Sequence, residues 1–272
     1  MRTYRLPHSF RIATGLLLVL LCLLAAAGAR ADSCANSLGR ALPENREAAL
    51  GDEFEVLSWN IQKASNQGWD TDLASLGAGI DLAFIQEASL QAHLDEIIPG
   101  PLHRAFARGY TRPGNSTGVM TLSTGAPSGR CQVTAWEPWL GTPKAVSITE
   151  HPLRGRDERL LAINVHAVNF ELGLDSFSAQ FRALGAVLDL HRGPVILAGD
   201  LNTWNGGRQA LVERFTREHG LASVAFQPDL RTRAFGRALD HIYVRGLAST
   251  GARVIPVSSS DHNPLRVRLA LN

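Results

Sequence analysis

Several residues able to bind a metal ion or transfer a proton stand directly after apolar runs of the sequence. They are Asn60, Glu87, His166, the pair Asp200 and Asn202, Asp240, and the pair Asp261 and His262. Because strand ends and their loops gather on one rim of a layered fold, we expect these distant residues to share one site. Carboxylate and amide oxygens are the ligands that Mg²⁺, Mn²⁺ or Ca²⁺ prefer. With two histidines available for proton transfer, the set suits metal-assisted hydrolysis of a phosphate ester.

Each of these residues also has a purely structural interpretation when it is taken alone. Glu87 could be a solvated loop residue, and His166 could be a hydrogen-bonded histidine of the core. Asp200 and Asn202 could serve only to form a turn, since Asp and Asn favour turns. The occurrence of all of these residues together, each at the end of an apolar run, favours a functional site.

The elements that must position these residues are many short strands with a few helices among them. The spacing of apolar residues predicts strands over residues 54–59, 81–86, 118–123, 145–149, 160–165, 195–198, 239–244, 252–257 and 265–269. It predicts helices over residues 71–80, 88–97, 176–191 and 208–219. The strands are too many and too close for a doubly wound sheet. We therefore expect an α/β (α+β) fold in which helices flank a sandwich of two sheets.

The polar strand ends belong to a series of short motifs in a fixed order. The motifs are Ser58-Trp59-Asn60-Ile61, Ile85-Gln86-Glu87, Asn164-Val165-His166, Ala198-Gly199-Asp200-Leu201-Asn202, Leu239-Asp240-His241-Ile242 and Ser260-Asp261-His262-Asn263-Pro264. This series resembles the endonuclease/exonuclease/phosphatase superfamily, which has a DNase I-like fold. The resemblance covers residues 53–272 and implies a four-layer sandwich of two mixed β-sheets flanked by helices. It also implies an enzyme, a divalent-metal-dependent phosphoric ester hydrolase.

The resemblance assigns a metal site to three positions. Glu87 would be the principal ligand of Mg²⁺, or of Mn²⁺ or Ca²⁺, with Asn60 beside it. Asp261 would assist with the metal or with water. These assignments follow from the matching motifs alone.

The resemblance also assigns five catalytic positions. Asp200 would orient or deprotonate the attacking water, and Asn202 would hold a phosphate oxygen. His262 would contact the scissile phosphate, and Asp240 would orient its ring and favour its charged form. His166 would be a second contact to the phosphate or the leaving group.

Two further positions come from a closer resemblance to a poorly characterised bacterial branch of the superfamily. The motifs are Thr142-Pro143-Lys144-Ala145, His166-Ala167-Val168-Asn169-Phe170 and Asp200-Leu201-Asn202-Thr203-Trp204. They imply that Lys144 binds substrate as a cation near the phosphate and that Asn169 lines the cleft. A solvated surface charge is the alternative for Lys144.

The N-terminus has the pattern of a targeting segment. Three arginines precede an apolar run over residues 12–27, and Ala29-Arg30-Ala31 matches a cleavage site. We therefore expect a signal peptide over residues 1–31, a leader or linker over 32–52 and the catalytic domain over 53–272. The alternative is an uncleaved anchor, because the run nearly reaches spanning length. The protein is expected to be periplasmic or secreted if the segment is cleaved, and membrane-anchored if it is not.

Cysteine content leaves one pairing open. With Cys22 removed in the signal peptide, Cys34 and Cys131 could form a disulfide or remain two free thiols.

Net charge bears on the partners. Removal of the four arginines in residues 1–31 leaves 23 basic and 25 acidic residues, a net charge of −2. Proteins that bind nucleic acid through its backbone usually carry a basic excess, so charge gives no support to that partner. A phosphodiesterase or nuclease acting on a phosphodiester substrate still fits the motifs best, and no obligate protein partner is evident.

Two other functions remain open. A sphingomyelinase-like or small phosphoester phosphatase would need exposed apolar residues to reach a lipid, and Trp136, Trp139 and Leu140 are candidates that could equally pack at a turn. A non-catalytic binding module is more remote, because none of the motif residues is replaced.

Overall fold

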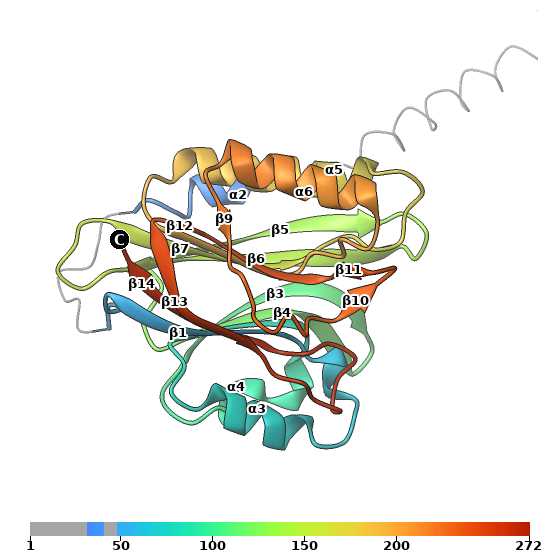
Figure 1. The fold of residues 1–272 in the computed structure, drawn as a ribbon, viewed down its shortest axis with the longest axis horizontal. Coiled ribbons are helices and arrows are strands. Elements are labelled where there is room, and N and C mark those ends of the chain that lie inside the picture. The colour runs from blue at the N-terminus through green and yellow to red at the C-terminus, as the bar shows by residue number, and fades with distance from the viewer. Residues whose placement is uncertain (1–31, 41–47) are drawn as a thin grey trace, which may run out of the picture.

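The computed structural model describes residues 32–40 and 48–272 (Figure 1). The segment predicted as a signal peptide, residues 1–31, lies outside the described residues. Within the described ranges, no helix has both the length and the hydropathy needed to cross a membrane.

The chain forms four layers, as predicted (Figure 1). Two six-stranded sheets face each other, and helices cover the outer face of each. Apolar side chains form three main clusters, one between the sheets and one between each sheet and its helices. Each sheet therefore buries both faces, which explains why its central strands are almost continuously apolar in sequence.

The first sheet is mixed. Only β1 and β2 pair in parallel, and the other neighbours are antiparallel. Its strands, in sheet order, are β13 (Leu247–Val254), β14 (Leu265–Leu271), β1 (Glu53–Asn60), β2 (Leu82–Ser89), β4 (Asn115–Ser123) and β3 (His103–Arg112).

The second sheet is mixed in the same way, with β7 and β8 as its parallel pair. A separate hairpin precedes β12. The strands, in sheet order, are β5 (Gly129–Glu137), β6 (Thr142–Pro152), β7 (Arg159–His166), β8 (Val195–Asp200), β12 (Asp240–Arg245) and β9 (Ala222–Ser223). The hairpin consists of β10 (Arg233–Ala234) and β11 (Arg237–Ala238).

The two long helices lie on the second sheet (Figure 1). The first buries Phe177, Phe181, Leu184 and Leu188, which recur at helical spacing. In the second, the side chain of Asn205 accepts a hydrogen bond from an N-terminal amide and caps the helix. The helices are α2 (Asp32–Ala35), α3 (Trp69–Gly77), α4 (Leu94–Ile97), α5 (Asp175–Leu190) and α6 (Gly206–Glu218), with 3-10 turns η1 (Gln62–Ala64) and η2 (Leu90–Ala92).

Some elements differ from the sequence expectation. The strand predicted over 252–257 is β13, which begins earlier and ends at Val254, because its first half is exposed and polar. The helix predicted over 88–97 divides into η2 and α4, since His93 between them adopts a left-handed conformation. Edge strands β3 and β5 were not predicted, because alternate side chains on them are exposed and the apolar signal is halved.

Alternation along the strands decides which side chains face the space between the sheets. In β1, Phe54 and Val56 belong to the core between the sheets, whereas Leu57 and Trp59 pack toward α3 and α4. Asn60 follows at the same parity as Phe54 and Val56, so it faces the opposite sheet.

Strands β7 and β8 repeat this pattern from the other side. Ile196 and Ala198 of β8 belong to the core between the sheets, and Asp200 follows on the same face. Ala162 of β7 lies in the same core, and His166 shares its parity. Polar residues at the strand ends are thus directed into one gap by the rule that buries the apolar residues before them.

Part of the segment expected to be a leader packs against the domain. Cys34 and Leu50 are buried, and Leu50 forms a β-bridge with Leu153. Cys34 is joined to Cys131 of β5 by a disulfide with a Cα–Cα distance of 5.1 Å. The leader is therefore attached to β5 and to the end of β6, both in the second sheet, at described positions on either side of residues 41–47.

Replacing both cysteines of this disulfide with serine is expected to lower the free energy of unfolding by about 3–5 kcal/mol. The bridge closes a loop of 97 residues, so its loss increases the conformational freedom of the unfolded chain. Urea denaturation of the oxidised wild type and of C34S/C131S measures the difference. Equal denaturation midpoints would show that the bridge does not contribute to stability.

Candidate active site

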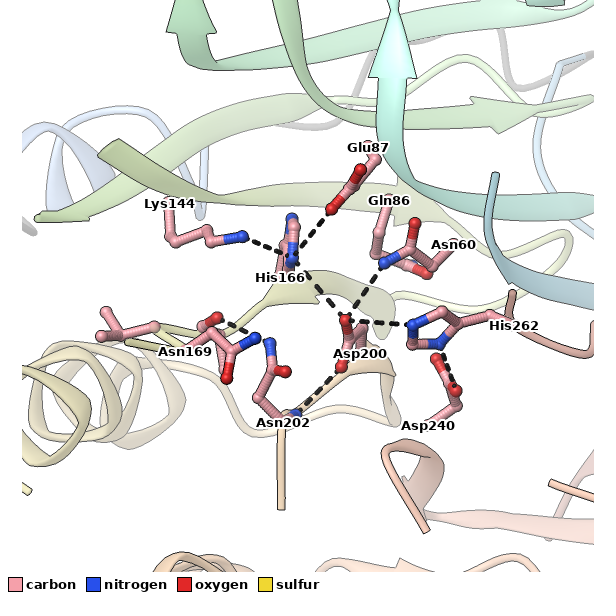
Figure 2. Close-up of polar contacts among 12 residues, drawn as sticks. Asn60, Gln86, Glu87, Lys144, His166, Asn169, Asp200, Asn202, Asp240 and His262 are labelled. Atoms are coloured by element: carbon pink, nitrogen blue, oxygen red, sulfur yellow. Dashed lines mark hydrogen bonds and ion pairs between the residues drawn. The ribbon is translucent and has the colours of Figure 1, made fainter. Parts of the chain in front are cut away.

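Polar side chains from the two sheets converge at one end of the sandwich (Figure 2). Asn60 and Glu87 approach from the first sheet, and His166 and Asp200 approach from the second. His262, on the loop before β14, completes the group. The structure thus brings together residues separated by up to about 200 positions, as the strand-end argument predicted.

Asp200 lies at the centre of this group and is 2% exposed. Its Oδ2 accepts a hydrogen bond from Nδ2 of Asn60 (3.1 Å), and its Oδ1 accepts one from the backbone N–H of Asn202 (3.0 Å). Burial raises the pKa of the Asp200 carboxyl to about 6, and the nearby Asp240 adds to this against the opposing charge of His262. A buried carboxylate with this pKa is suited to accept a proton near neutral pH.

His262 is paired with Asp240 on the other side of Asp200. Its Nδ1 lies 2.7 Å from Oδ2 of Asp240, and its Nε2 lies 4.0 Å from Oδ2 of Asp200. Burial alone would lower the pKa of His262, but the Asp240 and Asp200 carboxylates outweigh it and raise the pKa to about 10. The ring is therefore a cation at neutral pH, with Nε2–H on the side of Asp200.

The ring of His166 is neutral, in contrast to the cationic ring of His262. Its Nε2 accepts a hydrogen bond from Nζ of Lys144 (2.8 Å) and lies 3.6 Å from Oδ2 of Asp200. Burial, followed by the charges of Lys144, His262 and Lys63, lowers the pKa of His166 well below its ordinary value. His166 is thus a neutral ring that accepts at Nε2, and Lys144 supplies the cation at this position.

A backbone irregularity directs Glu87 into the cleft. By strict alternation it would share the helix-facing side of Ile85, but the pairing with β4 shifts register between Ile85 and Ala88. Glu87 itself has φ of 49°, in the left-handed region. Bulges of this kind re-aim a side chain at a site. The Glu87 carboxylate then lies 3.1 Å from Nζ of Lys63 and 3.9 Å from Nε2 of His166.

Asn60 connects β1 to the loop that carries His262. Its side-chain oxygen accepts a hydrogen bond from the backbone N–H of Gln62 (3.1 Å), and its backbone oxygen accepts one from Oγ of Ser260 (2.7 Å). Trp59 donates from its indole nitrogen to the backbone oxygen of His262 (3.0 Å). These bonds fix the His262 loop against the end of β1.

The donor set fits a hard divalent cation beside Glu87. Glu87 offers a partly exposed carboxylate, and the Glu87 and Asp200 carboxylates both lie close to Nε2 of His166, at 3.9 Å and 3.6 Å. Nδ2 of Asn60 donates to the same Asp200 carboxylate. A cation there would offset the cost of burying the Asp200 charge. Asp200, Asp240 and His262 also offer ligand atoms within 4.8 Å of one another. In that set Nδ1 of His262 is already bonded to Asp240 (2.7 Å), so a metal there would have to be bound through Nε2 of the ring.

Three predicted site residues have other principal contacts. Asp261 is exposed, and its Oδ1 accepts a long hydrogen bond from Oγ of Ser260 (3.5 Å). Its side chain therefore lies outside the group formed by Glu87, His166 and Asp200. Asn202 donates from its side chain to the backbone oxygen of Ala167 (3.1 Å). Asn169 accepts a hydrogen bond at its side-chain oxygen from the indole of Trp204 (2.9 Å). Asn202 and Asn169 therefore order the loops around Asp200 in this structure.

Arg208 holds those loops together, although no pattern in the sequence predicts this role. Its guanidinium, buried in the first turn of α6, donates to the backbone oxygens of Val168, Asn169 (2.7 Å) and Asn202 (3.4 Å). Burial lowers the pKa of Arg208, while the Glu171 carboxylate opposes this shift. Only the side chain's position in the fold distinguishes it from a surface helical arginine.

A second unpredicted feature is a polar bridge between the sheets. Gln86 of β2 donates from Nε2 to Oδ1 of Asn164 on β7 (2.8 Å), and Asn164 donates to the backbone oxygen of Met120 (3.0 Å). Both side chains are fully buried directly behind the site. In the sequence, the only indication of this bridge is that Gln86 stands in the motif of Glu87 and Asn164 in the motif of His166.

Gly199 permits the close approach of β8 to β7. It has φ of 140°, and a Cβ there would overlap the backbone oxygen of Val165. Replacing Gly199 with alanine is expected to lower the free energy of unfolding by about 3 kcal/mol and to displace Asp200. Urea denaturation measures the effect.

Gly251 is the matched control for this substitution. It lies in β13, and a Cβ at this position would meet no other atom within 4 Å, so G251A should change stability by less than about 0.5 kcal/mol. Equal stability of G199A and G251A would contradict the close-approach argument.

Next to these polar side chains lies a pocket of about 280 Å³. Its lining combines cationic, acidic and apolar side chains. They include Lys63, Glu87, Lys144, His166, Tyr110, Arg112, Leu140 and Phe170. The pocket therefore joins the predicted metal ligand to the predicted substrate-binding lysine.

Comparison with known proteins places this geometry in a family. The profile described as the Endonuclease/Exonuclease/phosphatase family matches residues 57–262. A protein of that description from Beutenbergia cavernae has a TM-score of 0.64 and 17% identity, over 81% of this chain and 72% of the other. The human Nocturnin catalytic domain, solved with a bound sulfate anion, has a TM-score of 0.59 and 16% identity, over 82% and 96%.

TDP2 from Caenorhabditis elegans is similar to the same extent, with a TM-score of 0.59 and 16% identity over 80% of this chain and 74% of the other. At these identities the structural likeness establishes the fold, and the site must be argued from this chain's own residues. The profile match begins within β1, ends at His262 and includes the first five motifs in full. The chain therefore belongs to the endonuclease/exonuclease/phosphatase family.

Proposed function

We propose that the protein is a divalent-metal-dependent phosphodiesterase that hydrolyses P–O bonds by attack of water. The observation that carries this proposal is the arrangement around Asp200. A buried carboxylate with a pKa of about 6 lies between a cationic His262 and a neutral His166. This arrangement offers a proton acceptor and a positive charge on adjacent sides of one small space.

Asp200 would accept the proton of the attacking water. Its Oδ1 and Oδ2 are held by the N–H of Asn202 and by Asn60, so the carboxylate has a fixed orientation. His262 would donate from Nε2–H to a non-bridging oxygen of the phosphate, and Asp240 keeps that ring protonated.

Glu87 would hold the metal, with Asn60 beside it. When bound, a divalent cation would neutralise charge on the phosphoryl oxygens. Lys144 would place its charge near the leaving oxygen, and His166 fixes Nζ of Lys144 in that position. Asn202 would keep Asp200 oriented, as its N–H does here, and Asn169 would order the neighbouring loop.

The sequence supports an extracytoplasmic location for the proposed activity. A cleaved signal peptide would make the enzyme periplasmic or secreted, and the disulfide between Cys34 and Cys131 suits an oxidising compartment. A nuclease acting there on DNA or RNA is one form of the proposed function. The motifs support it, whereas the net charge of −2 does not.

Hydrolysis of bis-p-nitrophenyl phosphate, plasmid DNA and RNA tests the proposal. Turnover of at least one is expected with Mg²⁺ or Mn²⁺, loss of turnover with excess EDTA, and recovery when the metal is restored. Undiminished turnover after EDTA treatment and dialysis would contradict the metal-dependent mechanism.

A further inference from the structure

Large apolar side chains are exposed around the mouth of the cleft. Among the described residues, nine large apolar side chains are exposed, and seven lie on four short segments, with exposed fractions between 39% and 88%. We call these segments the apolar rim: residues 110–112, 136–142, 169–172 and 233–237. The seven side chains are Tyr110, Trp136, Trp139, Leu140, Phe170, Leu172 and Phe235.

Contacts between the segments make the rim continuous. Tyr110, Leu140 and Phe170 line the same pocket as Glu87 and His166. The 136–142 turn is fastened to the 169–172 loop, because the buried Glu137 carboxylate accepts the backbone N–H of Asn169 (2.8 Å) and of Phe170 (3.3 Å).

The indole of Trp204 links the β10–β11 hairpin to the other segments of the rim. Trp204 donates to Asn169, and its ring lies 6.0 Å from the ring of Phe235 at the tip of the β10–β11 hairpin. That hairpin lies at the same end of the molecule as the arrowhead of β5 (Figure 1). Four segments distant in sequence therefore present apolar side chains around one opening.

The exposed charges of the rim are basic. Arg112, Arg233 and Arg237 are exposed on its segments, and Arg233 forms an ion pair with Asp229 just before the hairpin (2.6 Å). The two carboxylates of these segments are buried, since Glu137 is 1% and Glu171 is 9% exposed. Glu171 accepts the backbone N–H groups at the start of α5, so it is also turned away from the surface. The rim thus combines apolar side chains with positive charge.

We propose that the apolar rim docks on an anionic lipid bilayer, with the cleft facing the headgroups. Tryptophan and tyrosine favour the membrane interface, and arginine pairs with lipid phosphate. Leu140 and Leu172 favour a bilayer over single-stranded nucleic acid, because aliphatic side chains do not stack on bases. Docking itself does not depend on the proposed hydrolysis. Only the identity of the substrate rests on the proposed function: the phosphoester would be one that a membrane presents.

Quenching of tryptophan fluorescence by brominated lipid tests the docking directly. All five tryptophans lie outside residues 1–31, so the fluorescence does not come from the apolar N-terminal segment, and the comparison of variants shows which tryptophans contact the lipid. Vesicles of brominated phosphatidylcholine and phosphatidylglycerol are expected to quench the wild type. W136F/W139F should show about fourfold less quenching, because phenylalanine keeps the apolar surface but removes the reporters. The control W69F, on α3, should retain the wild-type response.

A second pair of variants measures affinity. L140S/L172S is expected to bind these vesicles about tenfold more weakly. The control is L190S, because Leu190 is 64% exposed but lies at the far end of α5, about 24 Å along the helix from the rim. All these side chains are on the surface, so the variants should unfold at the wild-type temperature.

Two outcomes would overturn the proposal. One is equal quenching of W136F/W139F and the wild type. The other is loss of affinity by L140S/L172S for a single-stranded oligonucleotide without any quenching of the wild type by vesicles, which would make the rim a nucleic-acid platform. Quenching does not require turnover, so failure of the proposed hydrolysis would leave the docking result standing.

Discussion

Replacing Asp200 with asparagine is expected to reduce kcat by about 10²–10⁴-fold. The substitution keeps the size of the side chain but removes the buried carboxylate that contacts Asn60, His166 and His262 together. Burial raises the pKa of Asp200 to about 6, which matches a proton acceptor at neutral pH. Steady-state hydrolysis of bis-p-nitrophenyl phosphate at saturating Mg²⁺ measures the effect.

Asp81 provides the matched control. Its carboxylate also accepts a backbone hydrogen bond, from Glu55 (2.8 Å), but at the opposite end of β1 from Asn60. D81N should keep wild-type kcat. A D200N enzyme with kcat within a few-fold of wild type would show that Asp200 is not the proton acceptor. Weaker metal binding by D200N would raise the Mg²⁺ concentration needed for activity. Because kcat is measured at saturating Mg²⁺, a loss of kcat cannot come from that cause.

The central strands of the fold could be predicted because their burial on both faces leaves continuous apolar runs. Alternation then carried the prediction to Asn60, His166 and Asp200, whose parity follows from the residues before them. The edge strands β3 and β5 could not be predicted in this way, because one row of side chains on each is exposed. Pairing with a neighbour from elsewhere in the chain defines them.

Other parts of the site depend on contacts that no local pattern encodes. Glu87 reaches the cleft only because of the register shift and its left-handed backbone. His166 is neutral and His262 is cationic, since one ring faces Lys144 and the other faces Asp240. The neighbours of each ring come from distant strands and become visible only in the folded chain.

Replacing Asp240 with asparagine is expected to move the alkaline limb of the pH profile of kcat/KM down by about 1–3 pH units. His262 must be protonated to donate to the phosphate, so activity is present below its pKa and is lost as pH rises through it. The Asp240 and Asp200 carboxylates hold that pKa at about 10 against burial. Without the Asp240 charge, burial has more influence and the pKa falls, so the limb moves toward neutral pH.

Substitutions of His262 and of His151 distinguish proton donation by His262 from a purely structural role. H262A should lose about 10²–10³-fold in kcat and should lack the limb, because the donor itself is absent. His151 is fully buried and bonded to Gly125 and Thr149, and burial lowers its pKa to about 4. H151A should therefore lower the temperature of unfolding but keep the wild-type profile. An unchanged limb in D240N would show that a group other than His262 supplies the proton.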